Sequence, residues 1–549
     1  MEHGYQVVIV GGGPVGVALA VELGQRGVSC ALIERHLTPQ LIPKGQNLTQ
    51  RTLEHFYFWG CVDELRAARL LPPGYPIGGV TAYGNLMSEY WYAPPGREAV
   101  QSYYFQENER LPQYCTEEVL RTRLKELPSV RTFFGWTAGG FEQDENGVRV
   151  TITPAEEGPF YSWSAEAQQE IGQESMPESA ETQILQADYL VGCDGGRSLV
   201  RESLAIERGG RSFEQRMVLA VLRSKELHEG LKRFPERTTY RVLRPELKGY
   251  WQFFGRVDVG EGWFFHAPVP PGTRQDNFDF HALVQEAAGF RFAAEFDYVG
   301  FWDLRVMVAS QYSKGRVLIA GDAAHQHPPY GGFGLNTGLE DVANLGWKLA
   351  AALQGWGGHQ LLESYSEERR PIFVETGEAV IAGGIERDRV FLERYNPEHD
   401  RAEFEEAWGR MATSAGGAQS YEPHYEGSSV VIGPPGSSCS IHGSHSFAAR
   451  PGHHLAPQPL SSGRNVFEEL GAGFTLIALD GGAQGSKAFE VAAKTFGVPL
   501  TVLRDTYDGG REAYESRLVL VRPDQYVVWT GDQPPSDVNG VIRRIVGIA

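Results

Sequence analysis

This sequence of 549 residues is poor in several features that would mark a specialised class of protein. It has only five cysteines, an odd number without any CxxC pair, which argues against a disulfide framework, a zinc ribbon and a dithiol redox centre. No hydrophobic run reaches the roughly 18 residues that cross a membrane. The apolar N-terminus is interrupted by glycines and has no basic segment, so it does not resemble a signal peptide. We therefore expect a cytoplasmic protein without stable membrane association.

Positive charge is also in deficit. The 50 basic residues against 69 acidic residues give a formal net charge of −19, which argues against nucleic acid or an anionic membrane as a partner. The remaining composition, with 42% hydrophobic and 22% charged residues, is that of an ordinary globular protein. Its length suffices for roughly three domains of about 150 residues each.

The N-terminal segment "YQVVIVGGGPVGVALAVELGQRGVSCALIER" carries a dinucleotide-binding motif. An apolar strand leads through Gly11, Gly13 and Gly16 into a helix of small residues, and a second strand ends at Glu34. Gly11 allows a tight turn, Gly13 lets a pyrophosphate approach the helix N-terminus, and Gly16 lets the helix pack on the strand. Glu34 would accept hydrogen bonds from a ribose and repel a 2′-phosphate, so the motif favours FAD or NAD over NADP.

A second glycine-rich segment, "GDAAHQHPPYGGFGLNTGLEDVANLGWKLA" at 321–350, precedes a helix. Leu339, Val342 and later apolar residues recur at helical spacing. We expect Asn336 or Thr337 to cap this helix, with Glu340 and Asp341 in its first turn. The glycines before it would let a flat, bulky ligand approach the backbone, close to the free N–H groups of the helix N-terminus.

A third segment, "ADYLVGCDGGRSLVRESL" at 187–204, places Asp194 at the end of a short apolar strand. Arg197 and Arg201 follow at the start of a helix. An acid beside basic residues suits a ribose-pyrophosphate ligand, but a structural turn with an ion pair on the helix surface explains the pattern equally well.

Together these motifs resemble those of the single-component, FAD-dependent aromatic hydroxylases, the family of p-hydroxybenzoate and phenol hydroxylases. The glycine motif at 11–16, the DG pair at 194–195 and the GD pair at 321–322 occur in the family's order and approximate spacing. "LPQYCTEEVLRTRL" at 111–124 resembles a further family segment. "GAGFTLIALD" followed by "VLVRPDQYVVW" is similar to the thioredoxin-like C-terminal domain of the longer phenol-hydroxylase branch.

The resemblance implies an α/β fold. A Rossmann-like FAD-binding domain is interleaved with an α+β substrate domain built on a β-sheet, and a thioredoxin-like α/β domain follows. We assign residues 1–73, 105–204 and 308–375 to the FAD-binding domain, 74–104 and 205–307 to the substrate domain, 376–446 to a helical linker region, and 447–549 to the thioredoxin-like domain. The polar, acidic segment 155–183 predicts a surface excursion between two strands.

The resemblance also implies roles for individual residues in binding FAD. Asp322 is expected to hydrogen-bond the ribityl or ribose part, and the glycine loop to lie against the isoalloxazine ring. The backbone amides near Leu335 and Asn336 would face flavin N1 and C2=O, where a helix N-terminus stabilises the negative charge of the reduced ring. The expected cofactor-binding residues are Gly11, Gly13, Pro14, Val15, Gly16, Glu34, Arg35, Lys44, Gln113, Asp194, Arg197, Gly321, Asp322, Gly332, Gly334, Leu335 and Asn336.

The implied reaction is a flavin monooxygenation. NADPH, or NADH, reduces FAD, O₂ adds to form a C4a-hydroperoxide, and an aromatic ring activated by a phenolate oxygen becomes hydroxylated. Pro329 matches the family proline whose backbone carbonyl lies near the substrate. Phenol hydroxylases carry an aspartate where this chain has Gln46, so another group takes the proton, the substrate is already acidic enough, or the reaction differs.

A predicted hairpin at 249–270, turning near 258–262, carries several aromatic side chains. Trp251, Phe253, Phe264 and His266 could face a flat aromatic substrate, with His266 a candidate catalytic group. An ordinary half-buried hairpin explains the same pattern equally well.

Other interpretations of the sequence stay open. The same scaffold supports Baeyer–Villiger oxygen insertion, and an FAD-binding protein or oxidase without hydroxylation is a further alternative. His325 and His327 suggest bases or metal ligands, but packing in a loop is favoured because no third ligand is evident, and we expect no metal. The expected partners are an aromatic small molecule and O₂, with a homodimer as a further option.

Overall fold

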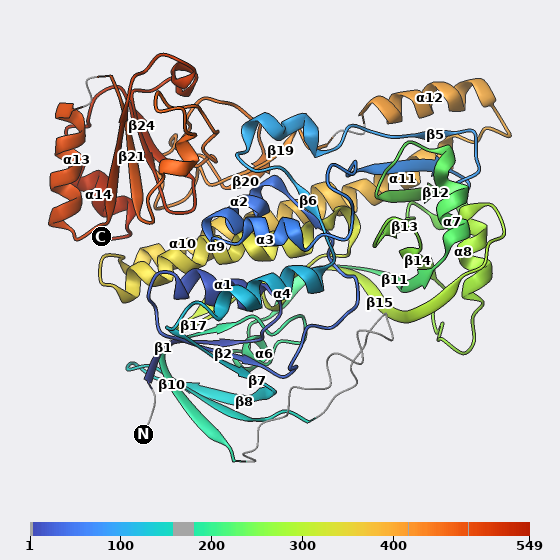
Figure 1. The fold of residues 1–549 in the computed structure, drawn as a ribbon, viewed down its shortest axis with the longest axis horizontal. Coiled ribbons are helices and arrows are strands. Elements are labelled where there is room, and N and C mark those ends of the chain that lie inside the picture. The colour runs from blue at the N-terminus through green and yellow to red at the C-terminus, as the bar shows by residue number, and fades with distance from the viewer. Residues whose placement is uncertain (1–3, 157–180, 415–416, 481–482, 549) are drawn as a thin grey trace.

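The computed structural model describes residues 4–156, 181–414, 417–480 and 483–548. Most of the predicted surface excursion at 155–183 lies outside these ranges. Two eight-stranded sheets and a smaller four-stranded sheet organise the molecule, with long helices running between them (Figure 1). None of the helices in the described ranges is long and apolar enough to span a bilayer.

The first sheet contains the N-terminal glycine motif. Its strands follow the order β16-β17-β10-β1-β2-β7, and β1 pairs in parallel with both β2 and β10. Its members are β1 (Gly4–Val10), β2 (Cys30–Glu34), β7 (Val130–Phe134), β8 (Trp136–Gln143), β9 (Val148–Pro154), β10 (Gln183–Gly192), β16 (Ser313–Lys314) and β17 (Val317–Ile319). β1 is apolar and buried on both faces from Val7 to Val10, as expected of a central parallel strand.

Helices cover the face of the first sheet that is uppermost in Figure 1. Helix α1 packs against both α4 and α9, so the sheet, α1 and the long helices form successive layers. These helices are α1 (Pro14–Gly24), α2 (Gln50–Phe58), α3 (Val62–Ala67), α4 (Gln113–Leu124), α9 (Phe333–Leu353) and α10 (His359–Glu375).

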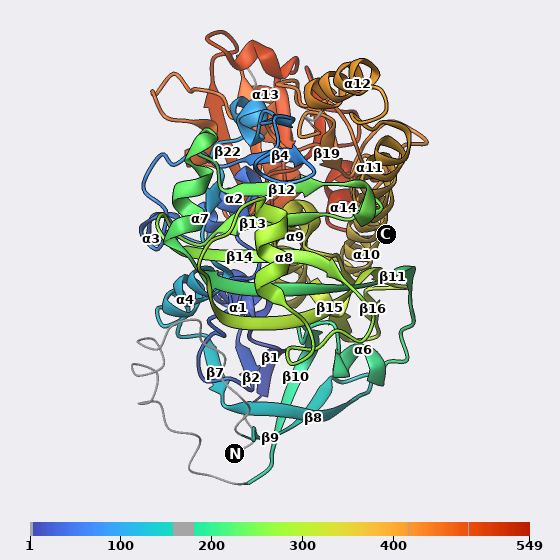
Figure 2. The ribbon, with the colours of Figure 1, turned by 90° about the vertical axis from the view of Figure 1, so that its right-hand side faces the viewer.

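The second sheet forms the other half of the molecule, in the order β18-β15-β11-β14-β13-β12-β4-β5. Its members are β4 (Gly79–Tyr83), β5 (Trp91–Tyr92), β11 (Arg208–Arg223), β12 (Thr239–Leu243), β13 (Gln252–Arg256), β14 (Gly262–Val269), β15 (Glu295–Ala309) and β18 (His325–Gln326). Helix α8 (Phe280–Ala288) covers one face, as Figure 2 shows. The predicted hairpin is confirmed as β13 and β14.

One helical path connects the two halves. Helix α10 continues through a π-helical segment (Thr376–Ala382) into α11 (Gly383–Arg394), and α12 (Arg401–Ser414) follows. On α11, Asp388 accepts hydrogen bonds from Arg241 and Trp251 of the second sheet's region. The first part of the region 376–446 is therefore helical and contacts the second sheet, while residues such as Tyr425 and Ile441 pack in a cluster with the C-terminal part.

The C-terminal sheet has the order β22-β21-β23-β24, with one parallel pair beside antiparallel strands. Its elements are β21 (Phe474–Leu479), α13 (Ala483–Thr495), β22 (Leu500–Asp505), β23 (Leu518–Val521), β24 (Val527–Gly531) and α14 (Val538–Ile545). Trp347 of α9 packs in the same buried cluster as Phe474 and Ile542. Strands and helices both occur here, as in an α/β domain, while the likeness to thioredoxin itself stays a prediction.

Short elements complete the described chain. They are β3 (Asn47–Leu48), β6 (Glu109–Arg110), β19 (Tyr421–His424), β20 (Ser440–His442), α6 (Leu199–Ser203), α7 (Lys225–Gly230), and 3₁₀ turns at Arg97–Tyr103, Leu231–Arg233, Pro245–Leu247, Gly321–Ala323, Tyr330–Gly332, Val466–Glu469 and Arg511–Tyr514.

Candidate active site

A cavity of about 1560 Å³ lies between the two large sheets. Its volume exceeds the roughly 300–1,000 Å³ of an ordinary small-molecule site, so it can hold a dinucleotide and a second ligand together. Many residues predicted from the sequence line it: Gly13, Pro14, Val15, Lys44, Gln46, Gln113, Arg197, Trp251, Phe253, Phe264, His266, Asp322, Pro329, Gly332, Gly334 and Leu335.

The N-terminal glycines adopt the conformations that the motif predicts. Gly11 has φ +102°, and a Cβ there would lie 2.3 Å from the carbonyl oxygen of Cys193. A Cβ on Gly16 would lie 1.8 Å from the Gly11 carbonyl oxygen, so only glycine lets α1 pack this closely. Gly13 caps α1 and has no atom within 4 Å of an added Cβ, which leaves room for a phosphate at the helix N-terminus.

Glu34, at the end of β2, is fixed beside this turn. Its Oε2 accepts a hydrogen bond from the Gly12 amide at 2.7 Å, and its Oε1 accepts one from the His36 amide at 2.8 Å. Each oxygen keeps a lone pair that a ribose hydroxyl could use, so the role of Glu34 in binding the ribose stays a prediction. Neither Glu34 nor the exposed Arg35 is among the residues that line the cavity.

Two side chains of the segment around the DG pair hold its backbone turn, and a third faces the cavity. Asp194 Oδ2 accepts a hydrogen bond from the Val200 amide at 3.1 Å, and burial raises the pKa of this carboxyl. Arg201 donates to the backbone oxygens of Gly196 and Ala323. Both side chains therefore hold the turn, while Arg197 faces the cavity.

Asp322 of the GD pair faces the cavity from a turn where Gly321 has φ +59°. Burial raises the pKa of Asp322, against the opposing charges of His325 and Lys44. Asp341 of α9 holds this turn in place: its Oδ2 accepts hydrogen bonds from the Gly321 amide at 3.1 Å and from His325 Nε2 at 2.5 Å.

The start of α9 differs from the prediction. The helix begins at Phe333 after Gly332 as its cap, so Asn336 and Thr337 lie inside it and Glu340 and Asp341 come after the first turn. Gly331 and Gly332 have φ of +76° and +71°, and this left-handed backbone lets the helix begin four or five residues earlier than expected. The displaced polar side chains make tertiary contacts instead.

Asn336 connects the glycine loop to strand β3 and to the start of helix α2. Its Oδ1 accepts hydrogen bonds from the Thr49 amide at 2.9 Å and the Thr52 hydroxyl at 2.7 Å. Its Nδ2 donates to the backbone oxygens of Asn47 and Gly332. The loop beside the cavity is thus held by side-chain contacts across nearly 290 residues of sequence.

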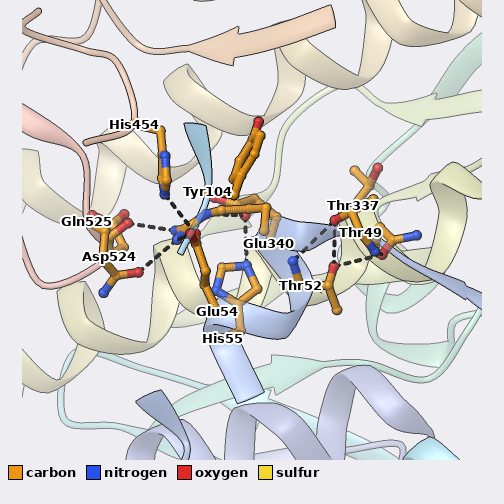
Figure 3. Close-up of polar contacts among 12 residues, drawn as sticks. Thr49, Thr52, Glu54, His55, Tyr104, Thr337, Glu340, His454, Asp524 and Gln525 are labelled. Carbon is orange, nitrogen blue, oxygen red and sulfur yellow. Dashed lines mark hydrogen bonds and ion pairs between the residues drawn. The ribbon is translucent and has the colours of Figure 1, made fainter. Parts of the chain in front are cut away.

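One turn further along α9, Glu340 binds the same helix α2. Figure 3 shows His55 directed at Glu340, with 2.7 Å between Nε2 and Oε2. Nearby, His454 of the C-terminal part contacts Glu54 at 2.7 Å. Burial and the charge of Arg51 lower the pKa of His55, against the opposing charge of Glu340. The C-terminal part is therefore tied to the helices that hold the loop.

The second sheet supplies an aromatic wall to the cavity. Trp251 stacks on Tyr330 with ring centroids 4.4 Å apart, and Phe253 stacks on His266 at 4.9 Å. Burial lowers the pKa of His266 to about 3, so its imidazole is neutral, and its Nδ1 is buried with no partner in the part of the chain that the structure describes. The hairpin thus faces the cavity, while its contact with a flat aromatic substrate stays a prediction.

Gln46 also has an unsatisfied buried atom beside the cavity. Its Nε2 donates to the Pro43 carbonyl oxygen at 3.2 Å, while its Oε1 has no partner among the described residues. Its neighbour Asn47 accepts a hydrogen bond from Arg110, a buried cation that lines the cavity. Arg110 was not predicted from the sequence, although its position three residues before the predicted FAD contact Gln113 could have indicated that it lies near the site.

The two loop histidines stack on one phenylalanine ring. His325 is held by Asp341 and stacks on Phe373 with centroids 4.2 Å apart, and His327 stacks on the same ring at 3.7 Å. Burial and the neighbouring His325 hold the pKa of His327 well below its ordinary value. In the described ranges neither histidine belongs to a group of three potential metal ligands.

Comparisons with known proteins agree with this geometry. A family model described as "FAD binding domain" matches residues 4–378, and one described as "Aromatic-ring hydroxylase, C-terminal" matches residues 448–549. Tetracenomycin A2 monooxygenase-dioxygenase from Streptomyces glaucescens is 28% identical over 98% of this chain and 95% of its own length. 4-Methyl-5-nitrocatechol 5-monooxygenase from a Burkholderia species is 27% identical over 98% and 97%. The structure of aklavinone-11 hydroxylase with FAD and aklavinone has a TM-score of 0.82 and 25% identity, covering all of both chains.

Proposed function

Since this chain belongs to the FAD-binding family of aromatic-ring hydroxylases and is a flavoprotein monooxygenase, we propose that it hydroxylates a large, flat phenolic compound at the expense of NAD(P)H and O₂. The observation that carries the proposal is one continuous cavity, which runs from the dinucleotide motif to the aromatic wall of the second sheet. The nitrocatechol in the name of one relative is a phenolic compound.

The residues present fit FAD. The open space at Gly13 and Gly334, where an added Cβ would meet nothing within 4 Å, suits close approach of the pyrophosphate and the ring. Glu34, Asp322, Lys44 and Gln113 would hold its polar parts. When bound, FAD supplies the redox chemistry, taking hydride from NAD(P)H and activating O₂.

The chain's own residues bind and orient the substrate. Trp251, Phe253 and Phe264 offer flat apolar surfaces that pack against an aromatic ring and exclude water from it. The neutral imidazole of His266 can accept or donate one hydrogen bond at Nδ1, according to its tautomer. Pro329 lines the same space and, by the resemblance, presents its carbonyl oxygen to the substrate.

One observation favours a second candidate. Gln46 replaces the carboxylate that would deprotonate a phenol, and a ketone substrate would need no such base. Baeyer–Villiger insertion of oxygen is therefore the alternative. The cytoplasmic location and the homodimer inferred from the sequence stay predictions.

The test is product analysis with isotopically labelled O₂. The holoenzyme is incubated with NADPH and a panel of phenols, polyketide quinones, pyridinols and matching ketones, and products are identified by mass spectrometry and NMR. Hydroxylation requires one labelled oxygen on an aromatic carbon. A labelled ester or lactone supports the alternative, and hydrogen peroxide as the sole oxygen product for every compound contradicts both.

A further inference from the structure

Arg110 is a buried cation at the edge of the substrate cavity, and every partner of its side chain is uncharged. The residue is 2% exposed. One terminal nitrogen donates to Asn47 Oδ1 and the other to the Arg256 carbonyl oxygen at 3.2 Å, while Nε is buried with no partner among the described residues. The guanidinium carbon lies 5.8 Å from the centre of the Phe264 ring.

Nearby carboxylates do not neutralise this charge. Glu109, the adjacent residue, directs its carboxylate to Arg69 at 2.8 Å. Among the described residues that line the cavity, the acids are Asp303 and Asp322. Asp303 pairs with Arg305 at 2.8 Å, and Asp322 belongs to the cofactor's end of the cavity. Burial lowers the pKa of Arg110 to about 9, with no anionic neighbour to oppose it.

An uncompensated buried charge is unfavourable by several kcal/mol, so a site that keeps one is prepared for a ligand of opposite charge. Asn47 connects this charge to the start of α9, beside the glycine loop: its side chain accepts from Arg110, and its backbone oxygen accepts from Asn336 in the first turns of α9. Gln46, at the position where the resemblance expects a carboxylate base, immediately precedes Asn47 in the chain.

We propose that Arg110 is the counter-ion of an ionised oxygen on the aromatic substrate, a phenolate or enolate, and that the substrate loses this proton as it binds. The inference rests on the proposed function. On binding, the substrate's O–H bond breaks, the electron pair stays on oxygen and the proton passes to solvent. A cation within about 4–6 Å of a phenol favours its ionised form, typically by 1–3 pH units. Arg110 thus promotes ionisation of the substrate hydroxyl by its positive charge, whereas a carboxylate at position 46 would promote it by accepting the proton.

The test uses 4-nitrocatechol, whose ionised form has a distinct absorption band, and its dimethyl ether, which cannot ionise. Each is titrated into the holoenzyme without NADPH at a series of pH values. In the wild type the bound catechol should ionise at least one pH unit below the free compound. Arg110→Gln should abolish most of this shift and weaken catechol binding at least tenfold near neutral pH, while ether binding changes less than twofold.

Two further variants distinguish the effect of losing the positive charge from a general effect of substitution on the structure. Arg110→Lys keeps a cation and should retain most of the shift, and Arg305→Gln, at an exposed, paired arginine of the same cavity, should leave it unchanged. FAD content and melting temperature verify folding, and the wild-type measurement stands even where a variant fails to fold.

A result that contradicts the role of Arg110 differs from one that contradicts the proposed function. A bound catechol that ionises at or above the pH of the free compound overturns the role of Arg110, as does an Arg110→Gln variant that weakens catechol and ether equally. If neither the catechol nor any phenol of the product panel binds to the wild type, the proposed function fails, and this inference with it.

Discussion

Replacing Arg522 should show how strongly the C-terminal part supports the active site. Its side chain is fully buried and donates to both oxygens of Glu368, on α10, at 2.8 Å each. It also donates to both oxygens of Asp524 at 2.6 and 2.8 Å. Lys348 of α9 binds Glu368 at 2.7 Å, so two cations balance two carboxylates.

Arg522→Met leaves this buried group with one excess negative charge. Removing one partner of a buried ion pair destabilises a protein by about 3–5 kcal/mol. Whole domains are stable by only about 5–15 kcal/mol, so the loss is a large fraction of the total. Because α9 and α10 position the glycine loop, FAD should also dissociate more readily. The assay is urea unfolding of the FAD-saturated protein, with bound flavin measured in parallel.

Two comparisons make the result decisive. Arg517→Met removes a half-exposed arginine that lies 3.4 Å from Asp480, and should change the free energy of unfolding by only about 0–1 kcal/mol. Arg522→Met with Asp524→Asn leaves Lys348 and Glu368 balanced and should recover part of the loss. A cost for Arg522→Met as small as that of Arg517→Met, or a double variant worse than the sum of the single ones, would refute the charge-balance argument.

Three further predictions concern the cavity itself. Glu34→Ala and Asp322→Ala should each lower the FAD content of the purified protein, from opposite ends of the cofactor; full occupancy in both would show that the site is misassigned. Gly332→Val places a Cβ 3.3 Å from that of Asn47 at φ +71°, which strains the backbone by about 1–3 kcal/mol. The variant should slow flavin reduction by NADPH, measured by anaerobic stopped flow, or divert the reaction to peroxide, measured by oxygen consumption. Burial lowers the pKa of His266 to about 3, below the roughly 6.5 of the unfolded chain, so the unfolded state binds more protons between these values and stability falls as pH falls through this window. His266→Gln should remove up to about 1.4 kcal/mol per pH unit of that dependence between pH 6 and 4, and an unchanged slope in urea unfolding would contradict the burial argument.

The parts of the site that were predictable from sequence are those whose requirement is local. Gly11, Gly13 and Gly16 were predicted to make a turn, to leave space for a ligand and to permit close packing, and the structure gives each that role. The aromatic hairpin was equally local, because alternating strand residues share a face, although its facing the cavity was only one of two options.

The start of α9 shows where local reasoning failed. Asn336 is a good capping residue by type, yet its amide bonds Thr49, Thr52 and Asn47 instead. A helix begins where its backbone can turn and where its side chains find partners, and those partners lie nearly 290 residues away in the chain.

The sequence by itself determined the cofactor class, the strand and helix order around the glycine motifs and the family. Tertiary structure alone decided which charges are balanced. Arg522 finds Glu368 across 154 residues and is neutralised, whereas Arg110 is equally buried and meets only amides, carbonyls and a ring. The physical reason is that the energy of a buried charge depends on every group within a few ångströms, and chain position does not specify those groups.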